Sequence, residues 1–336
     1  MKLRCRTLLV FVLMASAFTS AIGQERVLQT NSGSGNIHLI DPATNKVVGE
    51  ITGVPVNHGA AGSPDGKRLY FSSEAEQVLA VIDSKTLAIT KKIKLSARPN
   101  NIAISKDGGR VYVGIISQPG AIDVIDTVSL ERVASIPTKG GIHNLYVTPD
   151  GKYLIAGSIA GRVMTVIDTK TNEIAWTLFD EGIRPMAIEA NPDGSTKRLF
   201  VNVNKFHGFV VVDFATRKET ARITLPEIPV EQRAKGTFNN APSHGLGVAP
   251  NGKTLWVTSR MNHAAYAYSL PDLKYLGGTD VGSDPDWVTF SSDSKMVYVA
   301  CADADSVSAI DVASIKEVAR IPVGQSPKRN TTVTLR

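Results

Sequence analysis

The chain has 336 residues, 43% of them hydrophobic and 20% charged, which are the proportions of an ordinary globular protein. Its formal net charge is +6, and because no long run of Lys or Arg stands out, we expect no nucleic-acid partner. With only two cysteines, a fold held together by several disulfides is excluded.

Residues 1–23 have the pattern of a secretory signal peptide. An apolar core and small residues at a cleavage site follow a basic start formed by Lys2, Arg4 and Arg6. The core is shorter than the ~20 apolar residues of a membrane span, so we expect no transmembrane anchor. We therefore predict export to the periplasm or out of the cell. The mature chain would keep one cysteine, Cys301, which its apolar surroundings predict to be a buried, unreactive thiol.

A repeat fills the rest of the chain. Strand-like segments ending in Ile-Asp or its equivalent stop at Asp41, Asp83, Asp126, Asp168, Asp213, Ser269 and Asp311. Their spacing lies in the low forties of residues, the period of a four-stranded propeller blade. The one longer interval contains residues 227–243, which have no strand pattern and are predicted to form an inserted loop.

The strand pattern predicts an all-β fold, a seven-bladed β-propeller of four-stranded blades, over a single domain at residues 24–336. In each unit an inner strand reaches an Asp-Gly or Asn-Gly turn, which supplies the positive φ of a tight hairpin. The chain starts with three strands (residues 26–51) and ends with one strand in the inner-strand phase (residues 330–336). Pairing these segments would complete one blade and leave no open edge.

The pattern "SPDGKRLYFSS…AVID" resembles the YVTN-type repeat family of β-propellers, which are exported and surface proteins of bacteria and archaea. The resemblance covers nearly the whole mature chain. Its motifs are turn chemistry, so they specify architecture. The family is functionally mixed, and the resemblance therefore implies a fold and a compartment but no reaction.

Histidines concentrate on one predicted face of the ring. His58, His143 and His244 each open an inner strand, eight residues before a turn glycine, and His207 and His263 fall at loops between second and third strands. Read around the ring, the same inner-strand position is occupied in the other units by Asn100, Met186, Asp286 and Lys328. Only His38 lies elsewhere.

Two interpretations of these histidines stay open. Three imidazoles converging on a channel are a natural site for one divalent transition metal, so His58, His143 and His244 are candidate metal ligands. Alternatively they are structural or contact a ligand directly, because they share strand parity with large apolar residues that pack between blades. No cofactor other than such a metal is suggested.

Glu189 is the other unusual residue, because its inner-strand equivalents are small or neutral. It could act as a general base, with His143 as the second candidate catalytic residue. The alternative is a structural carboxylate paired with Arg184 or with an arginine of a neighbouring blade.

The remaining polar residues of this face suggest a binding surface, on which Arg329 and several carboxylates also lie. The candidate ligand-binding residues are Arg98, Asn101, Asn144, Arg184, His207, Arg260, His263 and Trp287. We therefore predict a monomeric binding or scaffold protein that presents one channel mouth to a small polar or anionic ligand or to a cell-envelope protein. The alternative is a metal-assisted hydrolase or lyase acting on a lactone-like substrate, by analogy with lactonases built on similar propellers.

Overall fold

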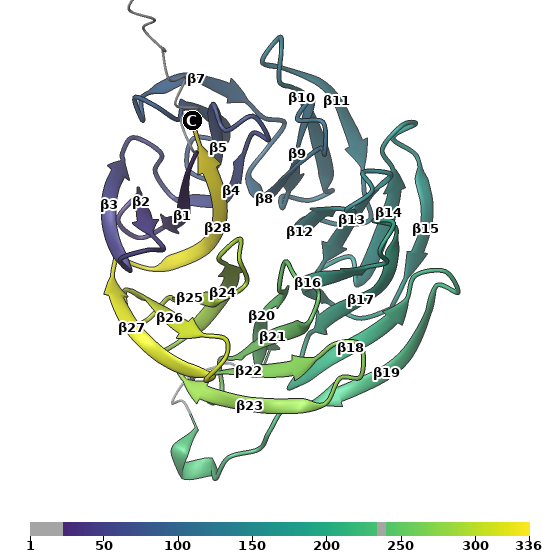
Figure 1. The fold of residues 1–336 in the computed structure, drawn as a ribbon. Coiled ribbons are helices and arrows are strands. Elements are labelled where there is room, and N and C mark those ends of the chain that lie inside the picture. Colours follow the sequence, from purple (N-terminus) through teal and green to yellow (C-terminus); the bar gives the residue numbers. More distant parts are fainter. Residues whose placement is uncertain (1–22, 234–239) are drawn as a thin grey trace, which may run out of the picture.

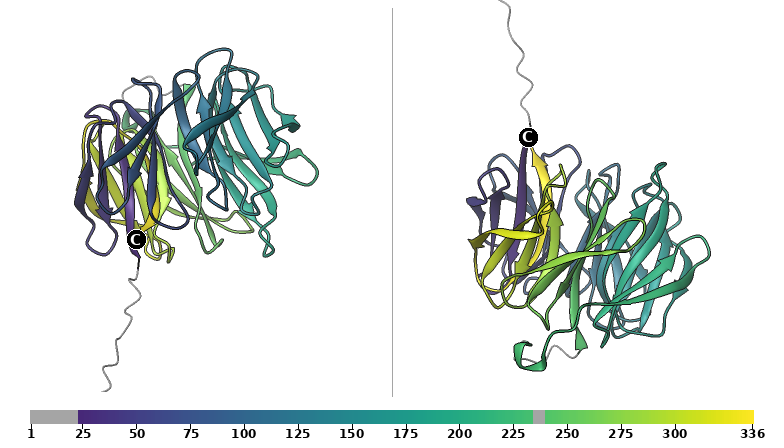
Figure 2. Two further views of the ribbon diagram at one scale, coloured as in Figure 1. Left: turned by 90° about the horizontal axis from the view of Figure 1, so that it is seen from above. Right: turned by 60° about the horizontal axis from the view of Figure 1, so that its bottom comes forward.

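The structure is a computed structural model that describes residues 23–233 and 240–336. Seven four-stranded antiparallel sheets are arranged around one axis, as Figure 1 shows face-on and Figure 2 from the side. The predicted seven-bladed β-propeller is therefore confirmed. Nearly all of the predicted signal peptide lies outside the described residues, among which no helix is long and apolar enough to cross a membrane.

The strands fall into four concentric layers (Figure 1). The inner strands are β4 (Asn57–Gly62), β8 (Pro99–Ile104), β12 (Ile142–Val147), β16 (Ile183–Ala190), β20 (Ser243–Val248), β24 (Pro285–Phe290) and β28 (Pro327–Leu335). The second strands are β5 (Arg68–Ser73), β9 (Arg110–Ile115), β13 (Tyr153–Ser158), β17 (Thr196–Val203), β21 (Thr254–Ser259), β25 (Met296–Cys301) and β1 (Gln24–Asn31). The third strands are β6 (Val78–Asp83), β10 (Ala121–Asp126), β14 (Val163–Asp168), β18 (Gly208–Asp213), β22 (Ala264–Ser269), β26 (Ser306–Asp311) and β2 (Asn36–Asp41). The outer strands are β7 (Ile89–Lys94), β11 (Glu131–Pro137), β15 (Ile174–Leu178), β19 (Lys218–Thr224), β23 (Tyr275–Asp280), β27 (Lys316–Pro322) and β3 (Lys46–Ile51).

The hydrophobic core lies between neighbouring blades. Second and third strands are buried along almost their whole length, because each of their faces packs on an adjacent sheet. Between β17, β18 and β22 the aromatic rings of Phe200, Phe209 and Tyr268 pack edge to face. Outer strands such as β19 are largely exposed, which explains their charged sequences.

The Pro-Asp-Gly turns behave as predicted. In the turn between β4 and β5 the Asp65 carboxylate accepts hydrogen bonds from Ser63 Oγ at 2.6 Å and from Lys67 N at 3.1 Å. Gly66 follows with a φ of 72°. This conformation is unfavourable for residues that have a side chain, whereas glycine adopts it readily. The glycines of these turns gather at one end of the channel, which we call the turn mouth. The opposite end, where inner strands begin, is the histidine mouth.

The ring is closed by pairing the last strand with the first. Strand β28 adds to β1 in a sheet of order β28-β1-β2-β3, with Thr332 opposite Val27. Figure 1 shows this blade as a yellow strand beside purple ones. The predicted closure is confirmed, and it leaves no unpaired inner strand around the channel.

The predicted inserted loop joins β19 to β20. Its described part contains one short 3₁₀ helix, η1 (Val230–Gln232), which projects from the rim of the ring (Figures 1 and 2). The Asn262 side chain ties the start of this segment to the neighbouring blade by donating to the Pro226 carbonyl at 2.9 Å. The described start of the insertion therefore lies at the periphery of the propeller.

Candidate functional site

Backbone pairing places one residue of every blade at the same level of the histidine mouth. In each blade, one residue at the start of the inner strand pairs with the end of the second strand. The residue in question is the next one along the chain. These seven residues, which we call the mouth ring, are His58, Asn100, His143, Arg184, His244, Asp286 and Lys328.

One member of this ring differs from the prediction. Counting back from the turn glycine pointed to Met186 in the fourth unit, whereas Ile183 pairs with the end of β17 and Arg184 follows it. The reason is the length of this hairpin: β16 and β17 have eight residues each, whereas β4 and β5 have six, so the start of β16 lies further from the turn glycine. Met186 lies deeper and lines the channel, and the mouth ring gains a cation.

Register shifts at this end of the inner strands help to orient the ring. In β12 the pairing with β13 shifts between Ile142 and Asn144, directly around His143. The same irregularity recurs at the start of β4, β8, β16, β20 and β24. Such bulges bend a strand and re-aim a side chain, which is their effect at His143 here.

The rings of His143 and His244 meet although β16 lies between their strands. Their centroids are 6.0 Å apart in an edge-to-face arrangement. Nδ1 of His244 lies 2.6 Å from the Asp286 carbonyl oxygen, so Nδ1 carries the proton and Nε2 keeps a lone pair. Burial first, and then nearby arginines (Arg329 for His143, Arg260 for His244), hold the pKa of both imidazoles well below the ordinary value. Both rings are therefore neutral at neutral pH.

His58 has a different partner. Its Nδ1 donates to the Glu74 carboxylate at 2.6 Å, which again leaves Nε2 unprotonated. Burial lowers the pKa of His58 although the carboxylate opposes this shift. Arg98, more exposed, approaches the same carboxylate at 3.8 Å.

Cations outnumber carboxylates in and around the mouth ring. Arg260 forms a bidentate ion pair with Asp284, and Lys328 Nζ donates to Asp286 at 2.9 Å. The guanidinium of Arg184 differs, because its Nε donates to the Asn204 amide oxygen at 2.6 Å. Among the described residues, no carboxylate lies within 4.0 Å of the Arg184 guanidinium. Burial, and next the charge of Arg260, lower the pKa of Arg184 to about 10.

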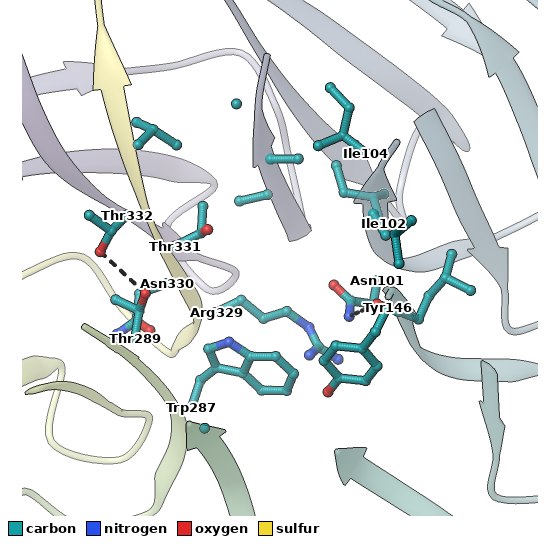
Figure 3. A pocket seen from close by; sticks show the side chains of 18 of the residues that line it. Asn101, Ile102, Ile104, Tyr146, Trp287, Thr289, Arg329, Asn330, Thr331 and Thr332 are labelled. Carbon is teal, nitrogen blue, oxygen red and sulfur yellow. Dashed lines mark hydrogen bonds between the residues drawn. The ribbon is translucent and has the colours of Figure 1, made fainter. Parts of the chain in front are cut away.

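Below the mouth ring the channel is crossed by one side chain, that of Arg329 (Figure 3). It extends from β28 toward Tyr146 on the far wall and is only 3% exposed. Its Nη2 donates to Asn100 Oδ1 at 3.1 Å and to the His143 carbonyl at 3.3 Å. The Trp287 indole stacks on the guanidinium at 3.9 Å. Beyond this layer a cavity of about 690 Å³ runs to the turn mouth.

The three histidines do not assemble the metal site that the sequence suggested. Within residues 23–233 and 240–336, no group of three or more His, Cys, Asp or Glu side chains is placed to hold a metal ion. The physical reason lies in their partners. His58 turns to Glu74 and His244 to the Asp286 carbonyl, while Nδ1 of His143 is engaged by the Asn144 amide.

Glu189 is not brought together with His143. It lies at the other end of β16, five residues or about 16 Å along the strand from Arg184. Its carboxylate pairs with Arg198 Nε and, at 3.0 Å, with Lys197 Nζ, both from the adjacent strand β17. Of the two interpretations, the structural ion pair is the one this geometry supports, with Lys197 and Arg198 in place of the predicted Arg184.

The remaining predicted ligand contacts divide into two groups. Trp287 and Asn101 line the cavity below the mouth ring, and the Asn144 amide forms a hydrogen bond with Nδ1 of His143. His207 lies outside the ring, where its Nε2 is 2.8 Å from Ser259 Oγ of the next blade. His263 sits in the turn between β21 and β22, and its carbonyl accepts from Val281 N at the blade's outer side.

Two residues that complete the site had no predicted role. Arg329 was placed on this face by sequence but not assigned to binding, and Tyr146 was not considered as a lining residue. The available signal was the pair Lys328-Arg329, which puts two cations at strand positions where two other units have His-Gly. Cys301 is fully buried as predicted, and burial raises the pKa of its thiol to about 11.

Comparison with known proteins supports the fold. Residues 26–144 match the family described as Cytochrome D1 heme domain. The uncharacterized protein YncE of Salmonella typhi is 22% identical over 298 residues, which cover 85% of this chain and 79% of that protein. Neither description names the YVTN-type repeat. The comparisons therefore support a resemblance to related β-propeller proteins in general and not to the YVTN-type family in particular.

Two solved structures have the same architecture. Hydrazine synthase of Kuenenia stuttgartiensis superposes with a TM-score of 0.74 at 22% identity, covering 90% of this chain and 99% of that chain. The periplasmic gluconolactonase PpgL of Pseudomonas aeruginosa also gives a TM-score of 0.74, at 16% identity, covering 93% and 99%. At these identities the likeness shows the fold alone.

Proposed function

We propose that this chain is a binding propeller that takes a small organic anion at its histidine mouth. The observation that carries the proposal is the Arg184 guanidinium. It lies in the mouth ring, is held by Asn204, and has no carboxylate within 4.0 Å in the part of the chain that the structure describes. A desolvated guanidinium recognises carboxylate and phosphate groups through two parallel hydrogen bonds.

The surroundings of Arg184 favour the same ligand class. The positive charges of Arg260 and Arg184 lower the pKa of His244, and those of Arg329 and Arg184 lower the pKa of His143. A positive potential at a partly enclosed mouth concentrates anions there. The neutral histidines can donate or accept hydrogen bonds to the rest of the ligand, so an organic anion with further polar groups fits best.

A carboxylate-bearing tetrapyrrole is one member of this class. The description of the family that residues 26–144 match names a haem domain, and this range contains both His58 and His143. A haem iron needs an imidazole nitrogen with a free lone pair. His58 and His244 each present Nε2 in that state because their Nδ1 atoms are bound elsewhere. Arg184 and Lys328 would then face the carboxylates of the macrocycle.

Export belongs to this proposal. The signal-like residues 1–23 and the likeness to a gluconolactonase described as periplasmic both support a site that works outside the cytoplasm. A protein partner of the cell envelope would contact the same mouth.

Calorimetric titration tests the anion site. Citrate, glucose 6-phosphate and haemin serve as probes against the wild type, Arg184→Gln and Arg320→Gln. Arg320 sits on outer strand β27 beside Glu317, so its variant removes one charge away from the channel. At least one probe should bind with one equivalent, and Arg184→Gln should weaken it at least tenfold, or about 1.4 kcal/mol, with Arg320→Gln unchanged. Equal affinity in wild type and Arg184→Gln, or no binding of any probe, would overturn the proposal.

Lactone hydrolysis is a second candidate, favoured by the free Nε2 of the buried, neutral His244. This nitrogen would take a proton from water as the water oxygen bonds to the lactone carbonyl carbon. The ring C–O bond then breaks, and the proton passes to the leaving alkoxide. Turnover of gluconolactone above the spontaneous rate, lost in His244→Gln at normal folding, would support hydrolysis. A rate equal to the spontaneous one in the wild type would remove this candidate.

A further inference from the structure

The cavity between Arg329 and the turn mouth has no role in the function proposed above. It has a volume of about 690 Å³, within the range of small-molecule pockets. None of the described residues that line it is a histidine, so it is chemically separate from the mouth ring. Arg329 and Trp287 form its inner end, as Figure 3 shows.

Arg329 brings an incompletely bonded cation to this inner end. Only its Nη2 has acceptors, while Nε and Nη1 are buried without a hydrogen-bond partner. No carboxylate of the described chain lies within 4.0 Å of it. A buried donor left without an acceptor costs about 1–3 kcal/mol, and more for a charged group. A ligand that supplies a carboxylate would recover this free energy.

The walls of the cavity define the body of such a ligand. Strands β8, β12, β16 and β20 contribute an apolar surface, formed by Ile102, Ile104, Leu145, Val147, Ile188 and Val248. Strands β24 and β28 contribute hydroxyls instead, those of Thr289, Thr331 and Thr332. Within this lining Arg329 is the one charged side chain among the described residues. A single negative charge on a body with one apolar and one polar side is the matching chemistry.

We propose that the channel holds a second binding site, entered from the turn mouth, for an amphipathic monocarboxylate whose carboxylate pairs with Arg329. The site is independent of the anion site at the histidine mouth. The hydroxyl wall accommodates a polar substituent along one side of the ligand, and the opposite wall buries its hydrocarbon part.

Trp287 is part of this site. Its indole stacks on the guanidinium and so contributes to the cover over Nε and Nη1. A carboxylate that pairs with these two atoms in the guanidinium plane places a negative charge beside the stacked indole. Binding at Arg329 therefore changes the environment of Trp287, and this change gives a readout that a distant site would lack.

The test is a fluorescence titration of the full chain with octanoate, selecting tryptophan emission. Saturable binding should change the emission, and Trp287→Phe should abolish the change, because the other tryptophans, Trp176 and Trp256, lie away from the cavity. Uncharged 1-octanol should bind at least tenfold more weakly than octanoate, and Arg329→Met should remove that preference. Arg329→Lys keeps the positive charge and should retain part of the preference for octanoate over 1-octanol. The Tm of each variant reports whether it folds.

Controls separate this site from the histidine mouth. Arg184→Gln, which alters only the histidine mouth, should leave octanoate binding unchanged. Equal affinities for octanoate and octanol in the wild type would overturn the proposal, as would no emission change at millimolar octanoate. Loss of octanoate binding in Arg184→Gln would show that only one site exists.

Discussion

His143 and His244 form an edge-to-face pair across the channel, with ring centroids 6.0 Å apart, although they belong to strands separated by β16. Neither ring has a carboxylate close enough to stabilise an imidazolium strongly. The nearest is that of Asp286, whose Oδ1 lies 3.9 Å from His244 Nδ1 and 3.4 Å from Arg260 Nε, while its Oδ2 pairs with Lys328. Protonating either ring would place a positive charge among arginines.

This pair makes stability depend on pH. Because the folded-state pKa values of His143 and His244 lie well below the ordinary histidine value of about 6.5, the unfolded chain binds more protons between the two values. We expect the free energy of unfolding to fall as pH drops from about 7 toward 5, at up to about 1.4 kcal/mol per pH unit for each histidine. Urea denaturation at a series of pH values measures this slope.

The double variant His143→Gln/His244→Gln is the control for that slope. It should flatten the dependence between pH 7 and 5, leaving the smaller contributions of His38, His58 and His207, whose pKa values are also lowered by burial. A slope equal to that of the wild type would mean that other groups carry the pH dependence.

Glu189 is predicted to contribute to stability and not to binding. Glu189→Gln removes one partner of Lys197 and Arg198 at a carboxylate that is only 8% exposed, and both cations lose part of their compensation. Since the lysine is 41% exposed and solvent screens its charge, we expect a loss of about 1–3 kcal/mol. Chemical denaturation gives the loss, while the affinities for citrate and octanoate stay the same. A change in either affinity without a change in stability would contradict this role.

Cys301 should be inert in the folded protein. Its side chain is fully buried, and burial raises the pKa of its thiol to about 11, so almost no thiolate exists at neutral pH. We expect negligible reaction with a thiol reagent such as DTNB under native conditions and one equivalent in denaturant. Rapid native labelling of the mature chain would show that β25 opens readily.

Two glycines, Gly161 in a loop at the histidine mouth and Gly194 in a hairpin turn at the turn mouth, test how tightly the first of these loops packs. A Cβ on Gly161 would lie 1.6 Å from the Lys139 carbonyl oxygen, whereas a Cβ on Gly194 would meet no atom within 4 Å. Gly161→Ala should therefore cost more than 3 kcal/mol by forcing the backbone apart. Gly194→Ala should cost about 1–2 kcal/mol, for its positive φ of 84° alone. Comparable losses in the two variants, measured in urea, would show that the contact at Lys139 yields easily.

Much of the architecture was predictable because it repeats. The turn glycines and the Ile-Asp strands mark each blade locally, and the unpaired segments at the two ends are complementary, so ring closure followed. The mouth ring was predictable wherever the two strands of the hairpin have their usual length. The prediction failed at β16, where longer strands place Arg184 in the position expected for Met186.

The contacts within the site were not predictable in the same way. Whether His143 meets His58 or His244 depends on how bulges at the strand starts rotate each side chain, and no local pattern encodes that rotation. The position of Arg329 depends on residues from β8, β12 and β24 at once. Such a site is a property of the closed ring, whereas the motifs are properties of single hairpins.

Ring closure also sets the order in which the protein becomes competent during its synthesis. Lys328 of the mouth ring and Arg329 of the channel both lie on β28, which follows the other described strands of the propeller in the sequence and is therefore synthesised after them. Until β28 pairs with β1, neither site contains its full set of charges. A molecule that has bound a ligand at either site is therefore one whose ring is closed. A chain interrupted before β28 lacks both ring closure and the two sites.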